Sequence, residues 1–219
     1  MENAKDSSME TTKRKTKSKT REYVESLIIA AIIAFFVRSF FIQAFRIPSS
    51  SMEPTLLIGD HLLVNRLSYV MKIPFTDKVI FTLGDPKKGD VIVFRYPKDT
   101  DKDFIKRVIA TEGDTVAIKD KVIYINGKKT EDKWGHYLDN MILPEHVNPR
   151  DNFGPIKVPQ NSYFVMGDNR DRSLDSRYWG VVTRDHLVGR ALILYFSLNG
   201  KPDNILGYIR WSRIGNLIR

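Results

Sequence analysis

The sequence predicts a mostly β domain that follows one N-terminal membrane helix. A long apolar run occupies part of residues 23–45, and after residue 46 the apolar residues fall in short runs that glycine or proline usually ends. No helical period of useful length appears between those runs. The 219 residues, 42% of them hydrophobic, suffice for one β-rich domain at 46–219, with a small β or loop insertion at 115–160.

The excess positive charge lies mainly at the two ends of the chain. Lys and Arg number 35 against 26 Asp and Glu, which gives a net charge of +9. Residues 1–22 hold seven basic and four acidic side chains, and residues 201–219 hold four and one, so each end contributes +3. The middle of the chain is nearly balanced, which argues against a soluble nucleic-acid-binding protein. The absence of cysteine excludes disulfides, thiolate nucleophiles and Cys-ligated zinc.

Residues 23–45 read YVESLIIAAIIAFFVRSFFIQAF and are predicted to form a transmembrane anchor helix. At 1.5 Å per residue the segment spans about 34 Å, which exceeds the roughly 30 Å of a bilayer's hydrocarbon core. The uninterrupted apolar run from Leu27 to Val37 leaves no polar face, which disfavours an ordinary core helix. A cleaved secretory signal would need small residues just after the run, but Phe40 to Arg46 are bulky apart from Ala44.

The basic tail, residues 1–22, predicts how the anchor is oriented. Residues 13–21 read KRKTKSKTR, with six cations and no acid, and such runs stay on the cytoplasmic side. We therefore expect a single-pass protein with a cytoplasmic N-terminus and with residues 46–219 outside. A nuclear or nucleic-acid-binding patch is the alternative, and its position directly before an apolar segment disfavours it.

The part after the anchor contains β-rich runs throughout. They read HLLVNRLSYV, DVIVFRYP, FIKRVIATEG, DTVAIKDKVIYING, SYFVMGD and LVGRALILYFSL. Asn126-Gly127 is the strongest hairpin signal, because both residues readily adopt positive φ in a tight turn. Residues 128–160 are polar without a clear strand, so we expect an insertion or flap there. The C-terminal ILGYIRWSRIGNLIR, with Tyr208 and Trp211, is expected to contact the membrane interface, to close the β domain, or both.

A short serine-rich loop directly after the anchor is a candidate for chemistry. Ser49 to Ser51 lie between Pro48 and Pro54, which restrict the backbone on both sides. Serines in loops more often serve as turn or capping residues, and a nucleophilic serine needs a base. The four histidines lie in polar or turn contexts typical of surface residues: His61, His136, His146 and His186. Neither a GxSxG elbow nor an HExxH zinc motif is present.

A lysine is the remaining candidate base. The strand FIKRVIA places Lys106 among apolar neighbours on one face and Arg107 among apolar neighbours on the other. Arginine stays protonated, whereas a lysine in apolar surroundings can lose its proton near neutral pH and accept one from a serine. Taken alone, the strand fits better an edge strand with a lysine whose amine reaches solvent.

Four ordered motifs carry a resemblance to a known family. PSSSM stands at 48–52, GDHLLVNR at 59–66, KGDVIVFRYP with FIKRVIATEGD at 88–114, and GDNRDRSLDSRYWG at 167–180. With the preceding anchor, they resemble the boxes of the type I signal peptidases, the bacterial leader peptidases, which are Ser-Lys membrane serine proteases. The resemblance covers the anchor and nearly all of the exported part. It implies an antiparallel β catalytic domain of the signal-peptidase type.

The resemblance also implies roles for individual residues. Ser51 would be the nucleophile and Lys106 its general base in an acyl-enzyme mechanism. The hydroxyl of Ser49 and the backbone N–H of Ser51 would form the oxyanion hole.

The last box would support the lysine. By resemblance, Ser173 would orient its amine, while Asp175 and Arg177 would form a supporting ion pair. Taken without the family, this acid-rich box could suggest a calcium loop, but the arginines at 170, 172 and 177 and the wrong Asp spacing argue against one.

The substrate implied by the resemblance is an exported preprotein whose signal peptide ends in small residues at −3 and −1. The positions that match the −1 pocket are Ile47, Met52, Leu56, Phe104 and Ile105. Those that match the −3 pocket are Phe45, Ile47, Leu62, Val93 and Ile105. Shallow apolar pockets with bulky walls would admit alanine and exclude larger side chains by steric clash.

Taken together, these features predict a membrane-anchored serine endopeptidase of the bacterial plasma (inner) membrane with its catalytic domain on the outer face. Its partners would be signal-peptide-bearing preproteins and membrane lipid, and no cofactor, metal or nucleic acid is expected. An organellar processing peptidase of the same family is one alternative, although Glu2, Asp6 and Glu10 do not fit a transit peptide. A catalytically inactive membrane-anchored binding module is another, against which the intact Ser51 and Lys106 argue.

Overall fold

The structure is a computed structural model that describes residues 18–72, 79–200 and 205–219. It divides into two compact units, Met1–Val37 and Arg38–Arg219. The predicted fold class is confirmed, because the second unit is built mainly of antiparallel strands and one N-terminal helix precedes it.

The N-terminal helix, α1, runs over Lys19–Phe40. An exposed pair between Arg21 and Glu25, one turn apart, adds support to its first turns (Nε–Oε1 2.9 Å). The prediction of one continuous helix over 23–45 is wrong at its end, because Ile42–Arg46 form strand β1. Those residues pair with a neighbouring strand, and this pairing overrides the apolar helix signal. No helix in the described part of the chain is both long and apolar enough to cross a membrane.

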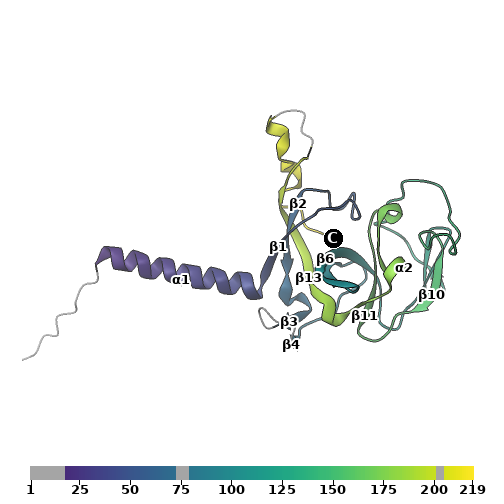
Figure 1. Cartoon of the computed structure of the whole chain (residues 1–219), viewed down its shortest axis with the longest axis horizontal. Coiled ribbons are helices and arrows are strands. Elements are labelled where there is room, and N and C mark those ends of the chain that lie inside the picture. Colours follow the sequence, from purple (N-terminus) through teal and green to yellow (C-terminus); the bar gives the residue numbers. More distant parts are fainter. Residues whose placement is uncertain (1–17, 73–78, 201–204) are drawn as a thin grey trace, which may run out of the picture. The chain divides into compact units, whose positions relative to one another are not determined.

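Seven strands form the main sheet of the second unit (Figure 1). They are β1 (Ile42–Arg46), β2 (Asp60–Asn65), β5 (Val91–Tyr96), β6 (Asp99–Thr111), β11 (Ser162–Met166), β12 (Val182–Thr183) and β13 (Leu187–Ser197). Their order is β1-β2-β13-β5-β6-β11-β12, and all neighbours are antiparallel. The 13-residue strand β6 is therefore flanked by β5 and β11. A short helix, α2 (Ser176–Trp179), follows β11 and leads towards β12.

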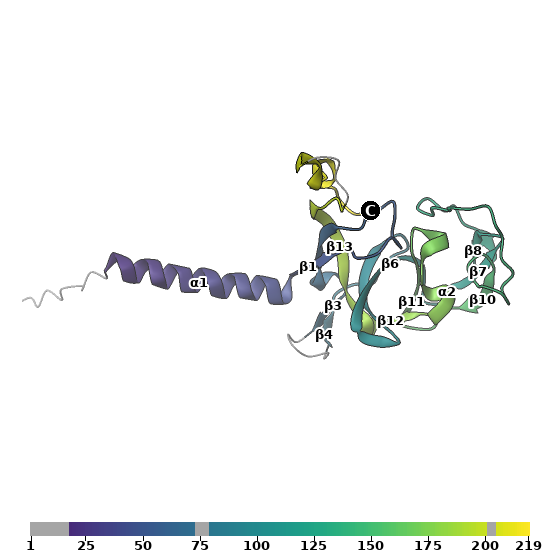
Figure 2. The ribbon, with the colours of Figure 1, turned by 45° about the horizontal axis from the view of Figure 1, so that its top comes forward.

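The predicted insertion forms a second sheet. Its four strands are β7 (Thr115–Lys119), β8 (Val122–Ile125), β9 (Lys128–Lys129) and β10 (Phe153–Lys157), in the order β10-β7-β8-β9. Figure 2 shows β7, β8 and β10 together on the side of the domain away from β1 and β13. A third, two-stranded sheet pairs β3 (Val70–Lys72) with β4 (Val79–Thr82).

Two expectations for the insertion had different outcomes. The turn at Asn126-Gly127 is confirmed, because both residues have positive φ (54° and 76°) and join β8 to β9. The expectation of no strand within 128–160 is wrong for β9 and β10. The FGPIK sequence of β10 hides its strand character, since Gly154 and Pro155 fall where the register with β7 shifts.

The C-terminal segment packs against the main sheet. Arg213 donates to the buried carboxylate of Asp60 (2.6 Å to Oδ2), and Ile218 is buried in the apolar cluster beneath β2 and β13. Its short 3-10 helices are Ile205–Tyr208 and Trp211–Arg213. The expectation that this segment closes the β domain is therefore confirmed. The side chains of Tyr208 and Trp211 are exposed.

Candidate active site

Ser51 and Lys106 meet in the interior of the domain. Lys106 lies in the middle of β6, opposite Ile92 of β5, and Ser51 lies in the loop between β1 and β2. A hydrogen bond of 2.7 Å joins Lys106 Nζ to Ser51 Oγ, and Nζ also donates to the carbonyl of Ile105 (3.0 Å). Both residues are more than nine-tenths buried. The two residues singled out by sequence therefore lie in direct contact although 55 positions separate them.

Burial changes the acidity of this lysine. Transfer of an ammonium ion out of water is unfavourable, so burial lowers the pKa of Lys106 to about 8. The negative charges of Asp175 and Asp168 raise it in part, while the positive charge of Arg177 lowers it further. An appreciable fraction of Lys106 is therefore neutral near physiological pH, and a neutral amine can accept a proton from the serine.

The serine loop is held by the segment that follows β11. The N–H of Asn169 donates to the carbonyl of Ser51 (3.2 Å), and the side-chain amide of Asn169 donates to the carbonyl of Ser50 (3.2 Å). The hydroxyl of Thr55 donates to Asp168 (2.6 Å). The hydroxyls of Ser49 and Ser51 lie 3.4 Å apart. Ser49 is thus beside the nucleophile candidate, as expected for a donor to an oxyanion.

Ser173 lies in the last box, and its predicted bond to the lysine is not among the described hydrogen bonds. Its hydroxyl accepts from the N–H of Gly167 (3.1 Å), which also donates to Asp175 Oδ2 (3.1 Å). The described hydrogen bonds of the Lys106 amine go to Ser51 and to Ile105. That Ser173 orients the lysine therefore stays a prediction.

The expected ion pair between Asp175 and Arg177 is present. Arg177 binds both carboxylate oxygens of Asp175, from Nε and Nη2, at 2.8 Å each, and both side chains are buried. Burial by itself would raise the pKa of Asp175, but the charge and hydrogen bonds of Arg177 outweigh it and lower that pKa. Arg177 also donates to the carbonyls of Arg150 and Arg170 (2.7 Å each). The pair thus fixes the backbone within the last box at Arg170 and ties the box to the insertion at Arg150.

A second buried ion pair was not predicted from sequence. Arg107 and Asp168 are both fully buried and joined by two hydrogen bonds (Nε–Oδ1 2.8 Å, Nη2–Oδ2 2.6 Å). The guanidinium of Arg107 also donates to the carbonyl of Gly89 (2.7 Å) and lies over the ring of Trp134 at 4.6 Å. The sequence did indicate that such a pair should exist, because an arginine among apolar residues of a central strand needs a carboxylate partner. It did not indicate which carboxylate that partner is.

The predicted pocket residues fall in two apolar clusters. Seven of them belong to one apolar cluster: Phe45, Ile47, Met52, Leu56, Leu62, Val93 and Ile105. The eighth, Phe104, packs in the neighbouring cluster, where its ring stacks on that of Tyr96 (4.5 Å). A cavity of about 340 Å³ opens beside Ser51 and Lys106, with Phe104 and Ile105 in its wall. The candidate dyad therefore lies at the edge of an apolar recess.

The described residues contain no group of three or more His, Cys, Asp or Glu side chains that could hold a metal ion. One histidine contacts the site region through its backbone. His136 donates its N–H to the carbonyl of Asp168 (2.7 Å), and its carbonyl accepts from the N–H of Arg170 (2.9 Å). The insertion is thus tied directly to the segment that holds the serine loop.

The chain is similar to known proteins over most of its length. The family model "Signal peptidase, peptidase S26" matches residues 20–196. The chain is 37% identical over 224 residues to "Signal peptidase I" of Pseudomonas fluorescens, with 89% of this chain and 78% of that relative covered. It is 35% identical over 193 residues to "Signal peptidase I T" of Bacillus subtilis (strain 168), with 86% and 93% covered.

A crystal structure of a signal peptidase I from Enterococcus faecalis V583 is 29% identical and covers 49% of this chain and 97% of its own, with a TM-score of 0.40. The family model matches most of the chain, and the two relatives exceed 30% identity over nearly all of it. The chain therefore belongs to the signal peptidase family, peptidase S26, and is a serine endopeptidase.

Proposed function

We propose that this chain removes the signal peptides of exported preproteins, with Ser51 as nucleophile and Lys106 as general base. One observation carries the assignment. Among apolar residues, the amine of Lys106 lies 2.7 Å from the hydroxyl of Ser51, and burial lowers its pKa to about 8. A serine needs a partner that can take its proton at the moment of attack, and this amine is in reach and partly neutral.

The chemistry then follows in two stages. Neutral Lys106 takes the proton of Ser51 Oγ as that oxygen attacks the scissile carbonyl, and the resulting ammonium returns a proton to the leaving amine. The signal peptide remains as an ester on Ser51. Lys106, again neutral, deprotonates a water molecule that hydrolyses the ester. Ser49 Oγ and the N–H of Ser51 stabilise the oxyanion in both stages, and loss of one such donor costs about 3–4 kcal/mol in other serine enzymes.

The apolar cluster supports the proposed specificity for small residues. Met52, Leu56, Leu62 and Val93 are essentially without solvent contact, so their side chains are fixed by close packing. They pack behind Ile105, which lines the cavity, so this wall cannot move back cheaply for a bulky side chain. Alanine at −1 and −3 is accepted and larger residues are rejected by clash.

We also propose that α1 anchors the enzyme in the bacterial plasma membrane with the N-terminus on the cytoplasmic side. The side chains from Leu27 to Val37 are exposed on every side of the helix, and Leu27, Ile32 and Phe35 each retain 60% or more of their accessible surface. A helix that is apolar all round requires an apolar environment. The exposed Tyr208 and Trp211 support a second contact with the lipid interface.

Cleavage of a preprotein with Ala at −3 and −1, followed in detergent by gel electrophoresis, tests the dyad. Ser51→Ala and Lys106→Met should each lower the rate by at least about a thousandfold, because each removes one half of a unit that acts together. Ser50→Ala is the matched control, since it removes a neighbouring hydroxyl with no assigned role, and it should retain wild-type activity. Wild-type activity in either dyad variant would show that the assignment is wrong.

A further inference from the structure

The cavity beside Ser51 has a second wall that the predicted apolar pockets do not include. Along the main sheet, β5 lies on one side of β6 and β11 on the other. The apolar cluster for −1 and −3 lies beneath β1, β2, β13 and β5, which is the first side. The segment that follows β11 supplies Arg172 and Leu174 to the cavity from the second side. A peptide that crosses the dyad from the first side must leave past this second wall.

Local backbone geometry directs Arg172 and Leu174 outward. Ser173, between them, is extended (φ −116°, ψ 122°), and its own side chain is buried against Gly167 and Asp175. Alternate residues of an extended chain point in opposite directions, so both neighbours of Ser173 face away from the interior. Both are exposed, and Leu174 retains 51% of its accessible surface.

The charge of Arg172 is not used within the described part of the protein. Arg107, Arg170 and Arg177, its neighbours in the same region, are each buried in a carboxylate pair. Among the described residues, the guanidinium of Arg172 has no hydrogen bond or ion pair. It is therefore available to a charged group of a bound peptide, beside a nucleophile candidate in the same cavity.

The wall that carries Arg172 is held rigidly. The preceding residue, Asp171, accepts from the backbone N–H groups of Leu138 and Asp139 (2.6 and 3.1 Å) and pairs with Lys121 (3.0 Å). These bonds tie the wall to the insertion sheet. A cation carried on a fixed backbone loses less entropy on binding than one on a mobile loop, so it discriminates better between substrates.

We propose that Arg172 belongs to the subsite for the first residues of the mature protein, beyond the cleaved bond, and selects an acidic side chain at the first or second position after the cut. This inference rests on the proposed function. Asp103 lines the same cavity on β6, and it faces Arg95 across the β5–β6 pair. Arg172 lies on the second wall, so the mature protein passes this cation as it leaves the site.

The test measures kcat/KM for four peptides with Ala at −3 and −1 that carry Glu or Lys at the first or the second position after the cut. The wild-type enzyme should prefer Glu to Lys by about two- to fivefold at one of these positions, the range of a solvent-exposed ion pair. Arg172→Glu should invert that preference. The preference should also weaken at about 1 M salt, because exposed charges are screened.

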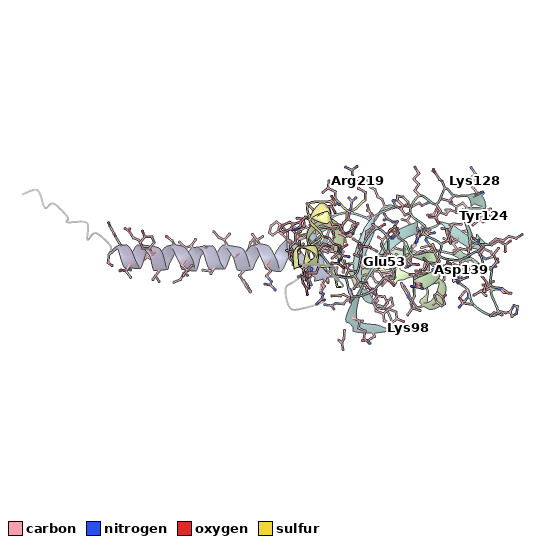
Figure 3. All side chains as sticks on the ribbon, turned by 90° about the horizontal axis from the view of Figure 1, so that it is seen from above. Glu53, Lys98, Tyr124, Lys128, Asp139 and Arg219 are labelled. Carbon is pink, nitrogen blue, oxygen red and sulfur yellow. The ribbon has the colours of Figure 1, made fainter. Side chains whose placement is uncertain are left out.

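Lys128→Glu is the control with the same change of net charge. Lys128 is exposed on β9, and Figure 3 shows it near Tyr124 at the end of the domain away from Glu53, which follows the serine loop. This variant should keep the wild-type preference. If Arg172→Glu cleaves with the same Glu-to-Lys ratio as wild type, the subsite assignment is wrong while the proposed function stands. If wild type cleaves none of the four peptides, the proposed function and the subsite both fail.

Discussion

At the scale of single residues, Lys106 determines how the rate depends on pH. Its pKa is lowered to about 8, mainly by burial, and only the neutral amine can accept the serine proton. We therefore expect kcat/KM to fall about tenfold for each pH unit below 8 and to reach a plateau above it. Rates measured at constant ionic strength between about pH 5.5 and 9.5 would check this. A profile flat across the whole range would contradict a lysine base, provided that chemistry limits the rate.

The residues of the site differ in how far sequence alone could predict them. Ser51 and Lys106 stand in ordered motifs, and their chemical types restrict the possible partners, so the pair was identified without a structure. Asp168 and Arg172 stand in the same last motif, yet their functions depend on what lies opposite them in space. Asp168, just after β11, neutralises Arg107 of the adjacent strand β6, and Arg172 faces a cavity formed by three segments. No spacing along the chain carries that information.

Ser173 shows how far the role of a residue can be inferred from a motif that it shares with a family. By resemblance its hydroxyl would bond the lysine amine, whereas its described hydrogen bond comes from the N–H of Gly167. Asp175, which accepts from the same N–H, acts on Lys106 through its charge and raises the pKa of the lysine in part. The role of Ser173 towards the lysine therefore stays a prediction.

At the scale of elements, the insertion supports β6 and the segment at 168–170, which hold the residues of the site. Trp134 covers Arg107, the backbone of His136 pairs with the segment at 168–170, and Asp132 neutralises Arg170. Arg170 is almost completely buried, and its Nη2 binds Asp132 Oδ1 at 2.7 Å. Arg170 also holds the carbonyl of Gly167 (3.0 Å). Residues 128–160 were expected to form an insertion or flap, and three of them contact residues of the site.

Removal of the Asp132 carboxylate should therefore destabilise the whole domain. Asp132→Ala leaves the buried guanidinium of Arg170 without its partner, and such a loss costs about 3–5 kcal/mol in other proteins. Asp132 itself is partly exposed, so we expect the lower part of that range, seen as a fall in the midpoint of urea denaturation. Glu131→Ala is the control, because Glu131 forms only an exposed pair with Lys133 and should change little. Equal stability of the two variants would contradict this supporting role of the insertion.

The elements themselves were predicted unevenly. Strands with clear alternation or continuous β-branched runs, such as β5 and β6, were identified from sequence. β10 was not, since its Gly154 and Pro155 are residues that strands generally avoid. The end of α1 was also misplaced, because Phe41 to Phe45 are as apolar as the helix before them. Their pairing with β2 is a tertiary contact, which local hydrophobicity does not reveal.

At the scale of the whole molecule, the two compact units suggest that membrane attachment and catalysis reside in different parts of the chain. The candidate dyad, the cavity and the ion pairs of Arg107, Arg170 and Arg177 lie within Arg38–Arg219. The exposed apolar side chains of α1 from Leu27 to Val37 lie within Met1–Val37. Removal of residues 1–37 should thus leave the catalytic machinery complete and abolish the main attachment to the membrane.

Two measurements on this truncated variant test whether attachment and catalysis are separate. Its kcat/KM for a short soluble peptide should stay within about threefold of wild type, since no residue of the site is lost. In sedimentation with phospholipid vesicles, the full chain should pellet and resist extraction at alkaline pH, whereas the truncated chain should pellet weakly and be released. The residual binding should fall further on Trp211→Ser, because Trp211 is the most exposed aromatic side chain of the C-terminal segment. The anchor would be contradicted if the full chain stayed in the supernatant. The separation of attachment from catalysis would be contradicted if the truncated chain folded but did not cleave the soluble peptide.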